Sequence, residues 1–157
     1  MSNAGDGPER LWFFDTTVIV RVAPDSGRDG ACVLEHFARA GDSPPLHVHR
    51  GQDEVFVMLA GAARFRLADK DLRVGAGECI LVPKGAPHSY LVTSAEGARW
   101  LTITLGRDFF DFVRAVGRPA TRDGLPDPSR PPTEAEREAV FGIAQRHGID
   151  FVGPPLS

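Results

Sequence analysis

Short strand-like segments separated by turn residues fill the first two thirds of this 157-residue chain. Between residues 11 and 105, runs of β-branched and aromatic residues recur roughly every 8–12 residues, and Gly, Pro, Asp and Ser cluster between them. Such spacing is typical of all-β sandwiches and barrels. The pattern therefore predicts about nine or ten short strands in one all-β domain.

The strand predicted over residues 54–60 (EVFVMLA) is the clearest of these segments. Alternate side chains of a strand point to opposite faces, so Glu54, Phe56 and Met58 share one face. Both faces are apolar beyond Glu54, which predicts a strand buried on both sides or part of a closed barrel. The other predicted strands lie in the second half of 11–22 and at 31–39, 47–49, 62–68, 72–74, 78–82, 88–92 and 99–105.

The composition changes after Gly106. Residues 108–116 have helical spacing, with an apolar stripe at Phe109, Phe112, Val113 and Val116. Five prolines between residues 117 and 132 predict an extended linker on the surface. The domain organisation we predict is a disordered N-terminus at 1–10, a β-barrel at 11–105, and a helical extension at 106–157 that packs on the barrel.

A second helix and an apolar tail are predicted at the C-terminal end of the chain. Thr133 and Glu136 have the spacing of a capping box, so a helix should begin there and run to about His147 before Gly148 ends it. His147 then falls in the last turn, where it would interact with the helix C-terminus rather than with a metal. The tail at 149–156 could cover the barrel.

Composition and charge narrow the class of protein. Hydrophobic residues make up 42% and charged residues 25%, as in ordinary soluble domains, and a net charge of −3 argues against nucleic-acid binding. An apolar run long enough for a membrane span and a signal-peptide core are both missing, which predicts a cytoplasmic protein. Cys32 and Cys79 match no zinc or redox spacing, so we expect reduced thiols unless their strands are neighbours.

Two histidines and a carboxylate form the chemically most informative stretch. His47 and His49 are two residues apart, so on a strand both point to one face and can grip one ion. Glu54 has the wrong parity for a single straight strand, and a turn at Gly51 would place it on a new strand facing the same interior. Imidazole and carboxylate ligands suit Fe, Mn, Ni, Cu or Zn. A fourth ligand is needed, and His88, which follows a buried strand and a tight turn, is the candidate.

His36 is a further histidine on a predicted strand. It could be an extra ligand, but we favour a strand histidine with its own hydrogen-bond partner.

The spacing of the ligands matches two longer patterns. The first contains Gly41, His47, His49, Glu54 and Gly61, with five, one, four and six residues between them; the second contains Gly77, Pro83, Gly85 and His88, with five, one and two between them. Together they resemble the two motifs of the cupin superfamily, over residues 41–92 by motif and about 11–105 by strand pattern. The resemblance implies a jelly-roll β-barrel with short C-terminal helices and one metal ion held by His47, His49, Glu54 and His88. The C-terminal helices also resemble small single-domain cupins of the quercetin 2,3-dioxygenase-like type.

The chain departs from the second motif at one position. That motif usually ends with Asn four residues after the histidine, where this chain has Val92, a change that leaves the ligands intact. By parity, Phe56 and Met58 share the face of Glu54, and Tyr90 and Val92 share the face of His88. We therefore predict a small, largely apolar pocket lined by these four residues. Tyr90 would either hydrogen-bond a substrate oxygen or be a core tyrosine with a satisfied hydroxyl.

Three functions fit such a site. The first is a dioxygenase acting on a small oxygen-rich or aromatic substrate, with Glu54 as ligand and proton acceptor and Tyr90 as a second catalytic residue. The second is a metal-dependent isomerase or decarboxylase that does not use O₂. The third is a non-catalytic module that binds a small molecule. The resemblance also implies a homodimer, for which the segment from Trp12 to Val22 is a candidate contact.

Overall fold

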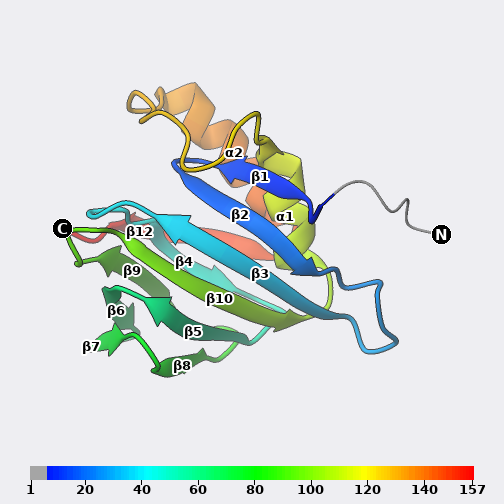
Figure 1. Cartoon of the computed structure of the whole chain (residues 1–157), viewed down its shortest axis with the longest axis horizontal. Helices are drawn as coiled ribbons and strands as arrows, with labels where there is room; N and C mark the ends of the chain where they lie inside the picture. Colours follow the sequence, from blue (N-terminus) through cyan, green and yellow to red (C-terminus); the bar gives the residue numbers. More distant parts are fainter. Residues whose placement is uncertain (1–6) are drawn as a thin grey trace.

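Two antiparallel sheets face each other and form a jelly-roll sandwich (Figure 1). The structure is a computed structural model that describes residues 7–157. Sheet A has seven strands in the order β11-β1-β2-β3-β10-β5-β8, and sheet B has five in the order β12-β4-β9-β6-β7. The first ten strands are β1 Arg10–Phe13, β2 Thr16–Val22, β3 Ala31–Ala38, β4 Pro45–His49, β5 Glu54–Ala60, β6 Ala62–Leu67, β7 Lys70–Gly75, β8 Cys79–Val82, β9 His88–Val92 and β10 Ala98–Leu105.

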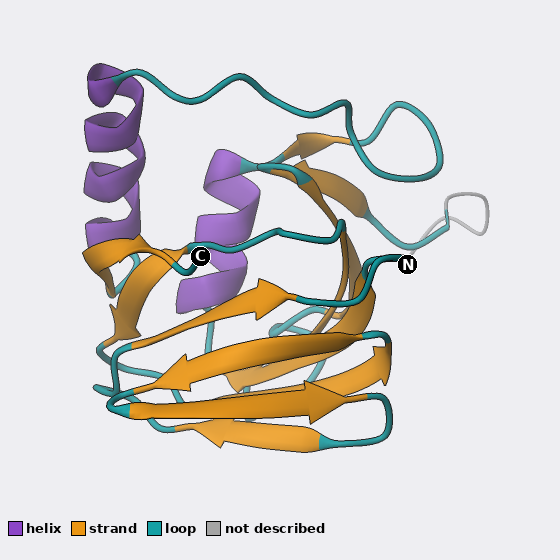
Figure 2. Cartoon of the chain, turned by 90° about the vertical axis from the view of Figure 1, so that its left-hand side faces the viewer, coloured by secondary structure: helices purple, strands orange, loops and turns teal. Residues whose placement is uncertain are grey.

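The remaining elements belong to the C-terminal third. They are α1 Asp108–Val116, β11 Arg118–Pro119, α2 Glu134–Arg146 and β12 Ile149–Pro155. The first helix has the predicted bounds, and the capping box of Thr133 and Glu136 forms at the start of α2 as predicted. Figure 2 shows both helices on the same side of the sheets. The tail forms a strand beside β4, with Ile149 opposite His49, so part of the predicted helical extension completes sheet B.

The N-terminal strands differ from the sequence prediction. A single strand was expected in the second half of residues 11–22, but the segment is a hairpin in which Phe13 lies opposite Thr16. Phe14 has a φ of 52° in the turn, a conformation that glycine usually adopts. The sequence has no glycine or proline there to signal this turn. The predicted disordered region at 1–10 falls mostly outside the described residues, and β1 begins at Arg10.

The alternation of side chains decides which face of each strand is buried. In β10 the even-numbered residues 98–104 are buried, and in β5 Glu54, Phe56 and Met58 are buried. Val55 and Val57 are only half-buried and Leu59 is exposed, so burial on both sides, the first of the two predicted alternatives, is wrong for this strand. The reason is that sheet A has one face toward sheet B and an outer face that is left partly exposed.

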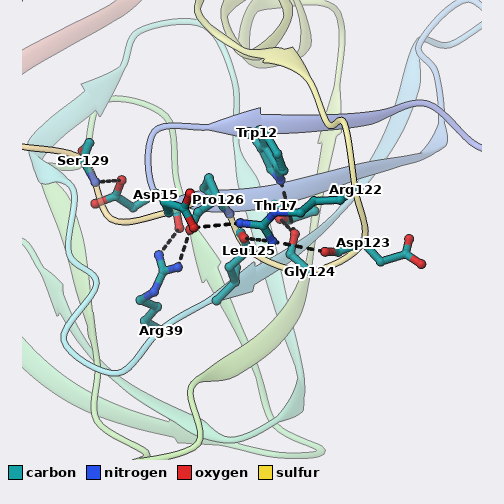
Figure 3. A network of polar contacts seen from close by, with 11 residues as sticks. Trp12, Asp15, Thr17, Arg39, Arg122, Asp123, Gly124, Leu125, Pro126 and Ser129 are labelled. Carbon is teal, nitrogen blue, oxygen red and sulfur yellow. Dashed lines mark hydrogen bonds and ion pairs between the residues drawn. The ribbon is translucent and has the colours of Figure 1, made fainter.

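The linker that precedes α2 is tied to the N-terminal hairpin. The indole of Trp12 and the hydroxyl of Thr17 both donate to the carbonyl of Gly124, at 3.2 and 2.8 Å. The Asp15 carboxylate accepts from the backbone N–H of Ser129 at 3.0 Å. Figure 3 shows these bonds holding the extended chain along β1 and β2. The linker therefore has a defined path toward α2.

Apolar residues form three clusters. One fills the space between the sheets around Met58, Phe65 and Trp100, and a second joins sheet A to α1 through Leu34 and Phe110. The third connects both helices to β12. In the part of the chain that the structure describes, no helix combines the length and apolarity needed to cross a membrane.

Candidate metal centre

Two neighbouring strands of sheet B carry the three histidines of the centre. His47 and His49 lie on β4, and His47 is directly opposite His88 at the start of β9. Glu54 begins β5 in the opposite sheet, so the chain crosses from sheet B to sheet A between His49 and Glu54, as the parity argument required. The ligand atoms of these four residues lie within 4.8 Å of one another. The structure thus brings together all four residues predicted as ligands.

The loop between β4 and β5 is held by Gln52, which the sequence analysis missed. Gln52 is buried, its side-chain amide donates to the carbonyl of Leu105 at 2.7 Å, and its side-chain oxygen accepts from the N–H of Phe109 at 3.0 Å. These bonds connect the loop to the end of β10 and the start of α1. Nothing local in the sequence distinguishes this glutamine from a solvent-exposed turn residue.

Backbone carbonyls orient two of the imidazoles. The Nδ1 of His47 is 2.7 Å from the carbonyl of Pro45, and the Nδ1 of His88 is 3.0 Å from that of Ala86. When Nδ1–H donates to a carbonyl, Nε2 carries the lone pair and can bind a metal. Each carbonyl lies two residues before its histidine, at the start of β4 for His47 and in the turn before β9 for His88, so the local backbone supplies the orientation.

Glu54 lies between two of the histidines. Its Oε2 atom is 2.9 Å from Nε2 of His88 and 3.2 Å from Nε2 of His49. Burial alone would raise the pKa of Glu54, but the imidazoles of His49 and His88 outweigh it and lower that pKa to about 2. Burial, together with the neighbouring imidazoles, lowers the pKa of His47 to about 3, and burial also lowers the pKa of His49. The site thus holds an ionised Glu54 carboxylate, and the lowered pKa values of His47 and His49 favour their neutral imidazoles; these are the forms that bind metal ions.

The residues fit a single metal ion. Opposite ligands of one first-row ion are roughly 4 Å apart, about twice a metal–nitrogen bond of ~2.1 Å. The observed limit of 4.8 Å is close to that value. Within residues 7–157, both ring nitrogens of buried His49 lack a hydrogen-bond partner, and a buried imidazole in that state is costly without an ion. The donor set suits Fe, Mn, Ni, Cu or Zn.

A cavity of about 850 Å³ extends from this centre. His47, His49 and Glu54 line it, and so do exposed residues of the linker and α2, including Arg130 and Arg137, where it reaches the surface. Much of the remaining wall is aromatic, from Phe56, Tyr90, Trp100, Phe109, Phe112 and Phe151. Its size and apolar lining are those of a small-molecule site.

Two of the four residues predicted to line the pocket do so. Phe56 and Tyr90 line the cavity, whereas Met58 and Val92 are buried in the cluster between the sheets. Parity gave their face correctly, but both lie farther along their strands, where the sheets close on each other. The wall of the cavity is therefore more aromatic than the predicted one.

Tyr90 has a satisfied hydroxyl. It donates to Oδ2 of Asp42 at 3.1 Å, and both residues line the cavity. Burial raises the pKa of Asp42 to about 6. Of the two alternatives predicted for Tyr90, the structure shows the tyrosine whose hydroxyl is satisfied within the protein.

The other candidate residues lie elsewhere. His147 is the C-cap residue of α2, where the sequence placed it. Cys32 and Cys79 are free thiols on β3 and β8, strands that are separated in sheet A by two others. His36 is not in the ligand cluster, and its Nε2 has no hydrogen-bond partner among residues 7–157. Instead its ring stacks on Trp100 with centroids 5.2 Å apart.

Comparison with known proteins supports this fold. The cupin domain family matches residues 33–104. Quercetin 2,3-dioxygenase from Bacillus subtilis is 29% identical over 79 residues, which are 50% of this chain and 23% of that protein. The match therefore spans about a quarter of the curated relative.

Solved structures show the same fold. The polyketide cyclase RemF from Streptomyces resistomycificus has a TM-score of 0.52 and 25% identity, covering 62% of this chain and 68% of its own. A protein described as a predicted oxalate decarboxylase from Thermotoga maritima has a TM-score of 0.57 and 21% identity, covering 65% and 94%. The family match, both motifs and the jelly-roll fold agree, and they identify residues 33–104 of this chain as a cupin domain.

Proposed function

We propose that this protein is a metal-dependent oxidoreductase of the dioxygenase type, acting on an oxygen-rich aromatic compound. The observation that carries the proposal is that the His47, His49, Glu54 and His88 cluster opens into a large cavity with aromatic walls. The likeness to a quercetin 2,3-dioxygenase supports it.

The residues of the chain have separate roles in this proposal. When bound, the ion supplies Lewis acidity toward adjacent substrate oxygens and an electron path to O₂. His47, His49, His88 and Glu54 hold it, and Glu54 also accepts the proton that the substrate loses on binding. Tyr90 holds Asp42 and presents its ring to the substrate. The aromatic wall excludes water from the reacting atoms.

Oxygen consumption tests the proposal. Protein reconstituted separately with Fe, Mn, Ni and Cu is assayed with flavonols, acireductones and catechols in an oxygen electrode. Uptake with at least one metal and one compound class is expected, and it should disappear in His49→Ala. A panel with no uptake above the metal-free control would refute the dioxygenase assignment.

A second candidate uses the same ion without O₂. The likeness to a polyketide cyclase, at 25% identity, favours Lewis-acid chemistry such as isomerisation, cyclisation or decarboxylation. Product formed under strict anaerobiosis would select this candidate. A metal-loaded protein that binds these compounds and transforms none would instead be a binding module.

We also propose a single catalytic unit, residues 11–157, that works as a cytoplasmic homodimer. The partly exposed outer face of sheet A, where Leu81 and Leu105 are more than half exposed, is an apolar surface for the partner copy. The N-terminal contact proposed from sequence would extend it. Sedimentation analysis of the protein and of Leu105→Glu checks the dimer.

A further inference from the structure

The cavity contains a second group of polar residues, away from the metal centre. Besides the two ring nitrogens of His49, three buried atoms within residues 7–157 have no hydrogen-bond partner and belong to residues that line the cavity: Nε2 of His36, Nε1 of Trp100 and Oγ1 of Thr102. These residues are only 4%, 1% and 2% exposed. Buried polar atoms are nearly always hydrogen-bonded in native proteins. Three such atoms in one cavity indicate that its ligand supplies the missing partner.

The strand register gives the distance between this group and the metal centre. Thr104 on β10 is opposite Glu54, and Trp100 on the same strand is opposite His36 on β3. Residues on one face of a strand recur about every 7 Å. Thr102 therefore lies about 7 Å, and Trp100 about 14 Å, along β10 from the level of Glu54.

An aromatic wall connects the two ends of the cavity. The ring of Phe109 is nearly parallel to that of His36, with centroids 6.1 Å apart. Phe109 also contacts His49, with centroids 5.5 Å apart and planes at 76°. Phe56, which lies opposite Thr102, adds to this wall. A flat ligand of two or three rings would pack along it.

The charges around His36, Trp100 and Thr102 determine whether these residues would bind a charged or an uncharged oxygen. Burial lowers the pKa of His36 to about 4, so its imidazole is neutral at pH 7 and, like the Trp100 indole, can donate one hydrogen bond. The arginines of the lining, Arg130 and Arg137, belong to the linker and α2 at the mouth. Asp42 is the acidic neighbour of Tyr90. A carboxylate would find no cation here, whereas a hydroxyl or carbonyl oxygen would find donors.

We propose that His36, Trp100 and Thr102 form a subsite that hydrogen-bonds an uncharged hydroxyl or carbonyl oxygen at the far end of a flat aromatic substrate. The opposite end of that substrate carries the adjacent oxygens that reach the metal centre. This inference deepens the proposed function and rests on it for the metal-bound end. It assigns the substrate to multi-ring aromatics with oxygens at both ends.

Calorimetric binding to three matched compounds tests the subsite. The probes are 3-hydroxyflavone, which has adjacent oxygens at one end only, and its 4′-hydroxy and 4′-carboxy derivatives. Each is titrated into metal-free and zinc-loaded protein. The 4′-hydroxy compound should bind about 3- to 10-fold more tightly than 3-hydroxyflavone, the value of one or two added hydrogen bonds, and the 4′-carboxy compound should bind more weakly than both.

Two variants and a matched control locate the effect. Thr102→Val and Trp100→Phe should each abolish the preference for the 4′-hydroxy compound while still binding 3-hydroxyflavone. Thr104→Val should keep the preference, because Thr104 is equally buried on the same face of β10 but does not line the cavity. No preference in the unmodified protein, or a preference that survives in both variants, overturns the subsite, and so does failure of all three probes to bind.

The metal-free titrations separate this inference from the proposed function. A hydroxyl preference in metal-free protein that zinc does not strengthen keeps the subsite and contradicts the metal-bound pose. A gain in affinity with zinc but no hydroxyl preference supports the metal-bound pose and overturns the subsite.

Discussion

The two ends of the cavity satisfy their buried polar groups in opposite ways. At the metal centre, backbone carbonyls orient His47 and His88, and Glu54 contacts two imidazoles, so that among the four ligand residues only His49 lacks a hydrogen-bond partner within residues 7–157. At the far end, His36, Trp100 and Thr102 have no partners among the described residues. The difference indicates that the metal centre is largely organised before anything binds, whereas the far end is completed by the ligand. The first would hold the reaction common to such sites, and the second would select the substrate of this chain.

Removing one of the metal-ligand side chains should produce the largest effect, a loss of metal binding. His49→Ala leaves three ligands and should weaken metal binding by more than about 100-fold, since even outer partners of ligands are worth 10- to 100-fold. Elemental analysis after purification without chelator measures occupancy. His147→Ala, at the end of α2, is the control and should stay fully loaded. Full occupancy in His49→Ala would mean that the metal centre is wrongly assigned.

His36, at the far end of the cavity, should make the free energy of unfolding fall in acid. The folded-state pKa of His36 is about 4, below its ordinary value of 6.5, because the ring is buried. The unfolded chain therefore takes up this proton first, so the contribution of His36 to stability is complete above pH 6.5 and is lost between pH 6.5 and pH 4.

The variant His36→Phe, which preserves a stacked ring, isolates this contribution. Between pH 7 and pH 4.5 it should lose about 2 kcal/mol less free energy of unfolding than the unmodified protein. Urea unfolding in the presence of a chelator measures the difference without a contribution from bound metal. Equal losses in both proteins would show that the pKa of His36 is the same in the folded and the unfolded state.

A variant of Gln52 tests whether the metal centre and the far end of the cavity depend on each other. Gln52→Met removes the bonds to Leu105 and Phe109 and should lower the free energy of unfolding by about 2 kcal/mol, since two backbone groups lose their partners. Phe109 lies between His49 and His36, so metal occupancy and flavonol affinity should both fall. If only one falls, the ends are independent.

The smallest expected effect is on the free energy of unfolding, and it should have opposite signs for Thr102→Val and Thr104→Val. Thr102→Val removes an unpaired buried hydroxyl and should raise the free energy of unfolding by about 1 kcal/mol. Thr104→Val removes the hydroxyl that pairs with Cys32 and should lower it by a similar amount. Thermal unfolding of the two metal-free variants gives the comparison. A destabilised Thr102→Val would show that its hydroxyl already has a partner.

The sequence determined the first part of the metal centre because the geometry of residues 47–54 is local. Two residues of separation place His47 and His49 on one face, and the turn before Glu54 starts a new strand. The second motif supplied His88. The strands of the barrel and both helices were also predictable, because period-2 alternation, helical spacing and a capping box are properties of short segments.

Only the tertiary structure decided which residues surround the substrate cavity. Parity gave the face of Met58 and Val92 but not their depth along the strand, so they were wrongly placed in the pocket. His36 and Trp100 are far apart in sequence and meet because β3 and β10 pair. The pairing of β12 with β4 likewise depends on hydrogen bonds between distant segments. A sequence pattern specifies the face of a residue, but strand order and register specify its neighbours.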